Sequence, residues 1–267
     1  MSTRAVSPAP YTRHVPRALA RTAAVVVLTL LAGCTPSVSS APPDATASGS
    51  PTVEAAAPAS ARPSDIPNPA ATPTWPRPGP VDTRTGAELD QPFTVDGVVV
   101  VSKAHPVSAN YSPPWTAEPQ GLNPDAYAAF GRMATDAQAD GLRLSIRSGY
   151  RDYATQAASF HRALRTYDEE TARRYFAEPG KSEHQTGLAF DVWDGVNRGS
   201  AFARTPQAAW VAANAHRYGF IVRYPDGKTD ITGYAWESWH LRWVGTDIAA
   251  QFGPDSSLTL EEYLGLA

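Results

Sequence analysis

The sequence predicts an α+β fold: a single domain with a small antiparallel sheet flanked by helices, preceded by a signal peptide and a disordered linker. Three observations support this prediction. Short β-branched or alternating segments are interleaved with segments of helical period, but without the regular strand and helix alternation of a parallel sheet. About 180 residues follow a proline-rich stretch, which is a suitable length for one domain. The N-terminal part of the chain differs sharply in composition from those residues.

Residues 1–33 have the composition of a secretory signal. They contain four arginines and no acidic residue, and the apolar run TAAVVVLTLLA that follows is shorter than the ~20 residues that span a bilayer. The run ends in LAGC, where Cys34 is the only cysteine of the chain. This ending resembles the lipobox of bacterial lipoproteins, which implies that Cys34 is lipidated and becomes the mature N-terminus. The alternative is an ordinary signal peptide in which Cys34 is incidental.

Residues 34–82 are predicted to form a disordered tether. Twelve of the 25 prolines of the chain lie in residues 35–80, and most other residues there are Ala, Ser and Thr. So little large apolar surface cannot offset the entropy cost of ordering. We therefore expect residues 83–267 to form an exported domain, held at the outer face of the cytoplasmic membrane in the cell envelope.

The charge of the expected mature chain argues against nucleic-acid binding. Removing the signal takes away four of 23 basic residues and none of 26 acidic ones, which leaves a formal charge of −7. An acidic protein attracts polyanions poorly. We therefore expect no nucleic-acid partner. Because the chain has a single cysteine, we also expect no internal disulfide, and we expect a monomer.

The first elements of the domain follow from local patterns. The β-branched residues 94–103 predict a strand, and a proline-rich surface loop follows it. Asn123 as N-cap, Pro124 at the first helical position and Gly141 as the stop predict a helix. Its expected buried stripe consists of Tyr127, Phe130, Ala134 and Ala137.

The remaining elements follow in the same way. Residues 142–147 alternate as a half-buried strand does. Further helices are expected over 153–167, over 168–177 and from Thr205 to Gly219, and further strands at FIVRY and SWHLRWV.

A histidine and an aspartate stand around the predicted strand GLAFDV. Strand parity places Leu188, Phe190 and Val192 on one face and Asp191 on the other, among small residues. His184, in the preceding loop, is placed to fold back toward Asp191. Two ligands are too few for a catalytic zinc, which takes three protein ligands and leaves one position for water.

The third ligand must come from another segment. His14 lies in the signal, His161 and His216 lie on predicted helices, and His105 lies in the proline-rich loop. His240 has Glu237 three residues before it. In a straight strand these two side chains would point apart, so we expect a turn at Glu237 and Ser238.

The segments SEHQTGLAFD, ESWHLRWVG, RSGYRDYATQ and VVVVSKAHPVSANYSP together resemble the VanY-type D-alanyl-D-alanine carboxypeptidases, which are LAS-type zinc peptidases of cell-wall stem peptides. The resemblance covers about residues 97–245. It implies one Zn²⁺ per chain, a catalytic base and an arginine that stabilises the transition state. It also implies residues that contact the substrate. The implied zinc ligands are His184, Asp191 and His240, the implied catalytic base is Glu237, and the implied transition-state arginine is Arg151. The implied substrate contacts are Ser182, Gln156, Tyr234 and Trp239.

Two positions depart from the family pattern. The family often has proline at the position of Ser238 and asparagine at that of Ser102, and neither change alters the implied ligand set.

The resemblance implies a zinc-dependent D,D-carboxypeptidase that removes the terminal D-Ala of peptidoglycan stem peptides by means of a metal-activated water. An L,D-carboxypeptidase or a D,D-dipeptidase of the same fold stays open, because the loops that select among them cannot be interpreted from one sequence. A non-catalytic, zinc-containing wall-binding module is a further alternative. The presence of Glu237 argues against it, since a structural zinc site needs no base.

Overall fold

A computed structural model describes residues 78–267, all within the C-terminal unit Pro67–Ala267. The expected signal, Cys34 and most of the expected tether lie outside the described residues. The helices are α1 Pro124–Ala139, α2 Tyr153–Leu164, α3 Glu169–Tyr175, α4 Pro206–Asn214, α5 Thr229–Thr232, α6 Thr246–Phe252 and α7 Leu260–Tyr263. The strands are β1 Phe93–Val95, β2 Val98–Val100, β3 Ser145–Ser148, β4 Ala189–Trp193, β5 Phe220–Tyr224 and β6 Glu237–Trp243.

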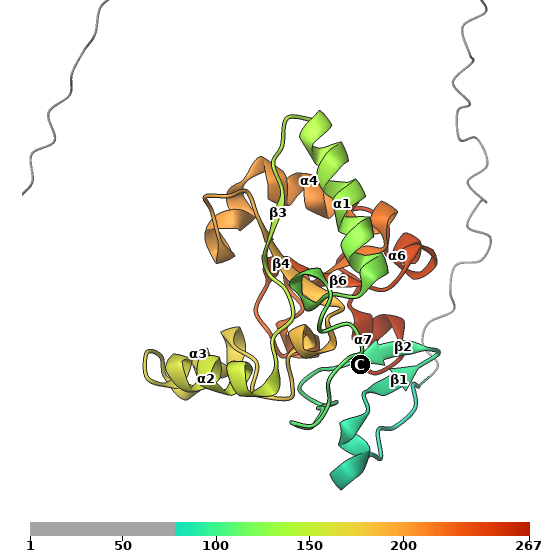
Figure 1. The fold of residues 1–267 in the computed structure, drawn as a ribbon, viewed down its shortest axis with the longest axis vertical. Helices are drawn as coiled ribbons and strands as arrows, with labels where there is room; N and C mark the ends of the chain where they lie inside the picture. The colour runs from blue at the N-terminus through green and yellow to red at the C-terminus, as the bar shows by residue number, and fades with distance from the viewer. Residues whose placement is uncertain (1–77) are drawn as a thin grey trace, which may run out of the picture. The chain divides into compact units, whose positions relative to one another are not determined.

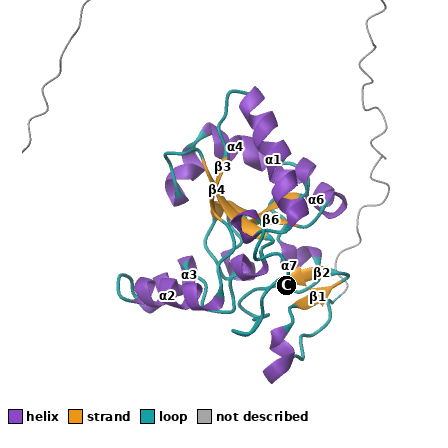
Figure 2. Ribbon diagram, viewed as in Figure 1, coloured by secondary structure: helices purple, strands orange, loops and turns teal. Residues whose placement is uncertain are grey.

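The predicted α+β class is confirmed. Strands β3, β4, β6 and β5 form, in that order, one antiparallel sheet. Figure 2 shows this sheet among the helices, with the separate β1–β2 pair beside α7. In Figure 1, α1 and α4 lie toward one end of the unit, and α2 and α3 lie side by side toward the other. Among the described residues, no helix combines the length and the apolar character needed to cross a bilayer.

The single strand predicted for residues 94–103 is wrong. The structure has a two-stranded hairpin, β1 and β2, whose turn is Asp96 and Gly97 with φ of 48° and 80°. Asp-Gly is the preferred pair for a two-residue hairpin turn, because both positions need positive φ. The Asp-Gly dipeptide is the sequence signal for a hairpin turn, and the prediction of one continuous strand did not take it into account.

Helix α1 begins as predicted, but its buried face is displaced from the expected stripe. The side chain of Asn123 accepts hydrogen bonds from two backbone N–H groups of the first turn. Tyr127 is 40% exposed, whereas Met133 is fully buried. The buried residues of the helix are Ala126, Ala129, Phe130, Met133 and Ala137. The buried face is therefore rotated about the helix axis relative to the predicted stripe. The small alanines on this face allow the helix to approach the sheet closely.

The core lies between α1, α4 and the sheet. Phe190 in β4 is fully buried, with its ring edge-on to Phe130 of α1 and to Phe220 of β5. The predicted parity of β4 holds, because Phe190 and Val192 are buried in this core while Asp191 is half-buried. The side chain of Asp191 therefore leaves the sheet on the face opposite the core.

Contacts of the domain begin a few residues before position 83. The backbone N–H of Gly79 donates to the carbonyl of Gly265, and the guanidinium of Arg84 pairs with Asp82. The helix expected from Thr205 to Gly219 is present as α4 followed by a tighter turn, Ala215–Tyr218, and Gly219 ends it with φ of 89°.

Candidate active site

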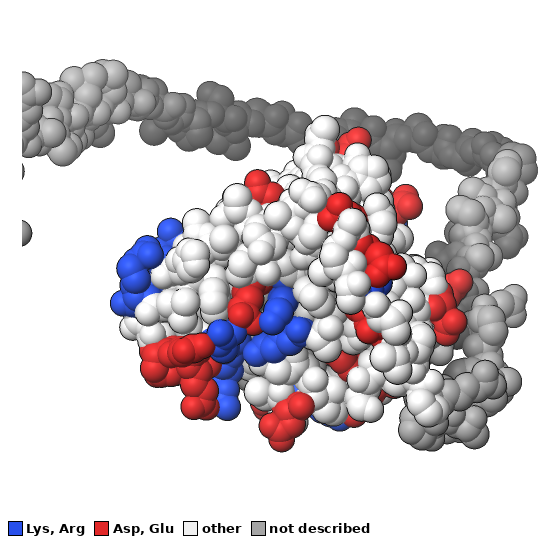
Figure 3. Space-filling model, turned by 90° about the horizontal axis from the view of Figure 1, so that it is seen from below, with Lys and Arg blue, Asp and Glu red and all other residues white. Residues whose placement is uncertain are grey.

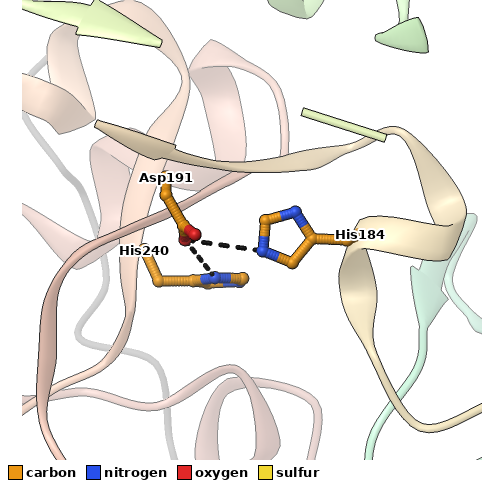
Figure 4. A group of neighbouring side chains, drawn as sticks. All are labelled: His184, Asp191 and His240. Atoms are coloured by element: carbon orange, nitrogen blue, oxygen red, sulfur yellow. Dashed lines mark hydrogen bonds and ion pairs between the residues drawn. The ribbon is translucent and has the colours of Figure 1, made fainter. Parts of the chain in front are cut away.

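His184, Asp191 and His240 converge at one point. One ligand atom of each lies within 4.8 Å of those of the other two. Oδ1 of Asp191 is 3.4 Å from Nε2 of His184 and 3.2 Å from Nδ1 of His240. Figure 4 shows both imidazole rings directed at this carboxylate.

Local structure explains this convergence. Asp191 of β4 and His240 of β6 are direct partners in the antiparallel ladder, so their side chains leave the same face of the sheet. His184 lies in a short 3₁₀ turn, Glu183–Thr186, which Gly187 closes with φ of 64°. An added Cβ at Gly187 would meet the indole of Trp115 at 2.4 Å, so only glycine fits where the chain turns from His184 toward β4.

The three residues fit a zinc ion. Tetrahedral bonds of about 2.0–2.2 Å place ligand atoms roughly 3.4 Å apart. The two separations between Asp191 and the histidines are 3.4 and 3.2 Å, and all three ligand atoms lie within 4.8 Å of one another. Nδ1 of His184 donates to the carbonyl of Gly149 at 2.7 Å, which leaves Nε2 free for a metal. Burial, followed by the charge of Arg151, lowers the pKa of His184. This imidazole is therefore neutral and ready to coordinate.

Glu237 is next to the ligands without belonging to the group. Its Oε2 lies 3.9 Å from Nδ1 of His240. Burial, only partly offset by the charge of His240, raises the pKa of Glu237 to about 8. A carboxyl with a pKa this close to neutrality can both accept and return a proton.

The expected turn at Glu237 and Ser238 is wrong. Both residues belong to β6, and the pairing of β5 with β6 shifts register instead: Val222 faces Leu241, but Tyr224 faces Glu237. Such an irregularity redirects side chains without ending the strand. It allows Glu237 and His240 to face the same cleft despite their opposite parity.

The site should release protons when it binds zinc. Burial lowers the pKa of His240, but Asp191 and Glu183 outweigh it and raise the pKa to about 9. At pH 7 the metal-free ring is therefore protonated on both nitrogens, and the metal must displace one of these protons, so zinc affinity should rise up to about tenfold per pH unit below pH 9. Calorimetry in buffers of different ionisation enthalpy should show at least one proton released per zinc. An affinity that does not change between pH 6 and 8 would contradict this.

Arg151 lines the same cleft. Its backbone N–H donates to the carbonyl of His184 at 3.1 Å, which fixes it to the ligand-bearing turn. The guanidinium Nε is buried without a hydrogen-bond partner among the described residues. Burial lowers the pKa of Arg151, an effect opposed by Asp191 and Glu237, and the group stays a cation. A cation with donors to spare is suited to a developing negative oxygen.

Replacing Arg151 by lysine should lower kcat by about 10²–10³, the usual cost of removing one fixed donor to a transition-state oxygen. Lysine keeps the charge but loses the planar fork. Steady-state kinetics should show this loss with KM changed far less. The matched control is Arg165→Lys, at an exposed position just after α2; an equal loss in both variants would contradict the role of Arg151.

The four expected substrate contacts line the cleft, which has a volume of about 790 Å³. The residues are Gln156, Ser182, Tyr234 and Trp239. The carbonyl oxygen of the Gln156 side chain has no partner among the described residues, although its amide donates to Ala177 at 2.5 Å. The hydroxyl of Tyr234 donates to the carbonyl of Lys181. Gln156 thus offers a free acceptor, and Tyr234 is a fixed wall.

Sequence reasoning missed other residues of the cleft. Arg147 of β3 and the exposed Arg162 of α2 both line it. Glu183, adjacent to the first ligand, is fully buried beneath the site. On the face drawn in Figure 3, basic side chains gather beside acidic ones on a largely uncharged surface. The sequence signals that could have indicated two of these residues are the glutamate within SEH, which is Glu183, and the arginine directly before SGYR, which is Arg147.

The fold and the site together are those of the carboxypeptidase class of metal-dependent enzymes. The family profile described as VanY: D-alanyl-D-alanine carboxypeptidase matches residues 119–246. The bifunctional D-Ala-D-Ala dipeptidase and D-Ala-D-Ala carboxypeptidase VanXYC of Enterococcus gallinarum is 32% identical over 179 residues, covering 61% of this chain and 91% of that protein. The chain belongs to the VanY D-alanyl-D-alanine carboxypeptidase family.

Solved structures agree with this family. The LdcB LD-carboxypeptidase aligns with a TM-score of 0.55 and 36% identity, covering 65% of this chain and 92% of that one. A mutant of the vancomycin resistance D,D-pentapeptidase VanY in complex with Zn(II) aligns with a TM-score of 0.53 and 31% identity, covering 62% and 97%.

Other curated relatives are longer. The D-alanyl-D-alanine carboxypeptidase of Enterococcus faecium is 36% identical over 136 residues, which are 51% of this chain and 41% of that protein. The chain spans about half the length of this relative and of two others, with 41% to 53% of each covered.

Proposed function

We propose that this chain is a zinc-dependent carboxypeptidase that removes the terminal D-Ala from peptidoglycan stem peptides, with the D,D bond of a pentapeptide as its substrate. The observation that carries the proposal is the arrangement of Glu237. Its half-buried carboxyl stands 3.9 Å from His240, outside the ligand group, and lines the same cleft. A purely structural metal site has no use for such a group.

The residues divide the work of hydrolysis. His184, Asp191 and His240 would hold the zinc ion, which would supply the Lewis acidity that makes a water molecule a better nucleophile. The carboxylate of Glu237 takes the proton of the attacking water and then delivers it to the leaving amine of D-Ala. The guanidinium of Arg151 faces the amide oxygen as it becomes negative.

A second specificity has its own support. The structure of LdcB, named an LD-carboxypeptidase, is 36% identical to this chain, and that of DacB of Streptococcus pneumoniae, named an L,D-carboxypeptidase, is 39% identical. The D,D-pentapeptidase VanY is 31% identical. An L,D-carboxypeptidase acting on a tetrapeptide is therefore the alternative substrate assignment for the same machinery.

One digest tests both activities. The purified domain, loaded with zinc, is incubated with a pentapeptide ending in D-Ala-D-Ala and with the matching tetrapeptide, and mass spectrometry identifies the products. Loss of one alanine from the pentapeptide, abolished by a chelator, supports the D,D activity, whereas cleavage of the tetrapeptide alone supports the L,D activity. If neither peptide is cleaved by zinc-replete protein that still binds them, the wall-binding module is the better description.

We further propose the cellular arrangement expected from the sequence. Residues 1–33 form a lipoprotein signal and residues 34–82 a tether, so that a lipid on Cys34 anchors the monomeric catalytic domain, 83–267, outside the cytoplasmic membrane. Metabolic labelling with a fatty acid should mark the protein and be lost in Cys34→Ser. Labelling that persists in this variant refutes lipidation at Cys34.

A further inference from the structure

Beneath the ligand group lies a buried ionic network. Glu183 and Arg223 are at most 1% exposed, as is Arg242, and Glu261 of α7 is 6% exposed. Oε1 of Glu183 accepts from Nε of Arg223 at 2.7 Å and from Nη1 of Arg242 at 2.8 Å. Both terminal nitrogens of Arg223 donate to the carboxylate of Glu261. Burying four charges is costly, and replacing such a network with apolar residues is often neutral or stabilising.

The second oxygen of Glu183 has a different partner. While both arginines hold Oε1, Oε2 lies 3.4 Å from Nε2 of His240, the ring nitrogen that faces away from Asp191. Arg242 also donates to the carbonyl of Val99, which fixes it from the other side. The carboxylate of Glu183 is thus held rigidly, with one oxygen directed at the back of a metal-binding imidazole.

We propose that Glu183 is a positioning residue: it accepts the Nε2 proton of His240, holds the ring in place and so presents Nδ1 to the metal. The proposal rests on the zinc site of the proposed function. The two histidines then coordinate through opposite nitrogens, and each donates its other N–H to a fixed acceptor. For His184 that acceptor is the neutral carbonyl of Gly149, whereas for His240 it is an ionised carboxylate. A charged acceptor makes the imidazole a stronger ligand.

The network also contains a carboxylate from the C-terminal helix α7, Glu261, which balances the charge of Arg223. Glu261 does not contact His240: it accepts from both terminal nitrogens of Arg223, whose Nε holds Oε1 of Glu183 and leaves Oε2 to His240. The chain therefore supplies a matched pair of carboxylates in one network, only one of which faces the metal ligand.

The test compares two variants that keep the network neutral. Glu183→Gln combined with Arg242→Met removes the carboxylate behind His240, and Glu261→Gln combined with Arg242→Met removes the other one. Zinc affinity, measured by chelator competition, should fall about 10- to 100-fold in the first variant and stay near the wild-type value in the second. Equal affinities in the two variants would overturn the proposal. A wild-type protein that binds no zinc would instead overturn the proposed function.

A measurement on the wild type decides the matter if a variant fails to fold. Nitrogen-15 NMR of the zinc-loaded protein shows which ring nitrogen carries the proton. We expect the proton on Nε2 of His240 and on Nδ1 of His184. A proton on Nδ1 of His240 would exclude Glu183 as its acceptor and overturn the proposal.

Discussion

Replacing Glu237 by glutamine should reduce kcat by about 10²–10⁴ while zinc stays bound. General acid and base catalysis contributes this much, and glutamine keeps the shape of the side chain but cannot take a proton. Glu237 is not one of the three grouped ligands, so its loss leaves the coordination of the metal unchanged. Steady-state kinetics on the preferred peptide, together with metal analysis of the same sample, measures both quantities.

The pH profile provides an independent check on Glu237. The residual activity of Glu237→Gln should lose the acidic limb of the wild-type profile, because that limb reports protonation of the base. The control is Glu169→Gln, an exposed glutamate at the start of α3, which should behave as wild type. If Glu237→Gln keeps full activity, or loses zinc along with activity, Glu237 is not the base.

Replacing His184 by alanine should remove zinc and activity together. Losing even the partner of a ligand costs about 10- to 100-fold in metal affinity, so losing the ligand itself should cost more. The protein should still fold, because the ring of His184 lies in the turn before β4 and is not part of either hydrophobic core. Metal analysis after dialysis and circular dichroism measure the two outcomes.

His161→Ala, on an exposed turn of α2, is the matched control for His184→Ala and should keep both zinc and activity. A His184→Ala protein that retains stoichiometric zinc at wild-type affinity would show that the metal, if present, is held elsewhere.

Much of the fold could be predicted because local chemistry decides it. Asn123 and Pro124 start α1 as a cap and first residue do, and the apolar parity of β4 places Asp191 on the face away from the core. The hairpin at Asp96 and Gly97 was missed because the β-branched residues on both sides mask a two-residue turn. Positive φ at these two positions, rather than hydrophobicity, decides that boundary.

The convergence of His184, Asp191 and His240 was predicted from the sequence, but the geometry that brings Glu237 beside them was not. The resemblance of SEHQTGLAFD and ESWHLRWVG to the family motifs predicts which side chains carry the chemistry, yet the way Glu237 reaches the cleft depends on a register shift between β5 and β6. The partners of Glu183 were equally hidden, since Arg223, Arg242 and Glu261 come from three different elements. Ion pairs between residues some forty to sixty positions apart depend on the tertiary fold and leave no periodic signal in one sequence.

The direct pairing of Asp191 with His240 has a consequence for stability. These residues belong to adjacent strands, so a cation bound between them fastens β4 to β6 at the centre of the sheet. Opening the sheet and releasing the ion are then a single event, and bound metal stabilises the native state in proportion to the logarithm of its free concentration. The melting temperature should therefore report metal occupancy directly, and loss of the ion should lower the stability of the folded domain.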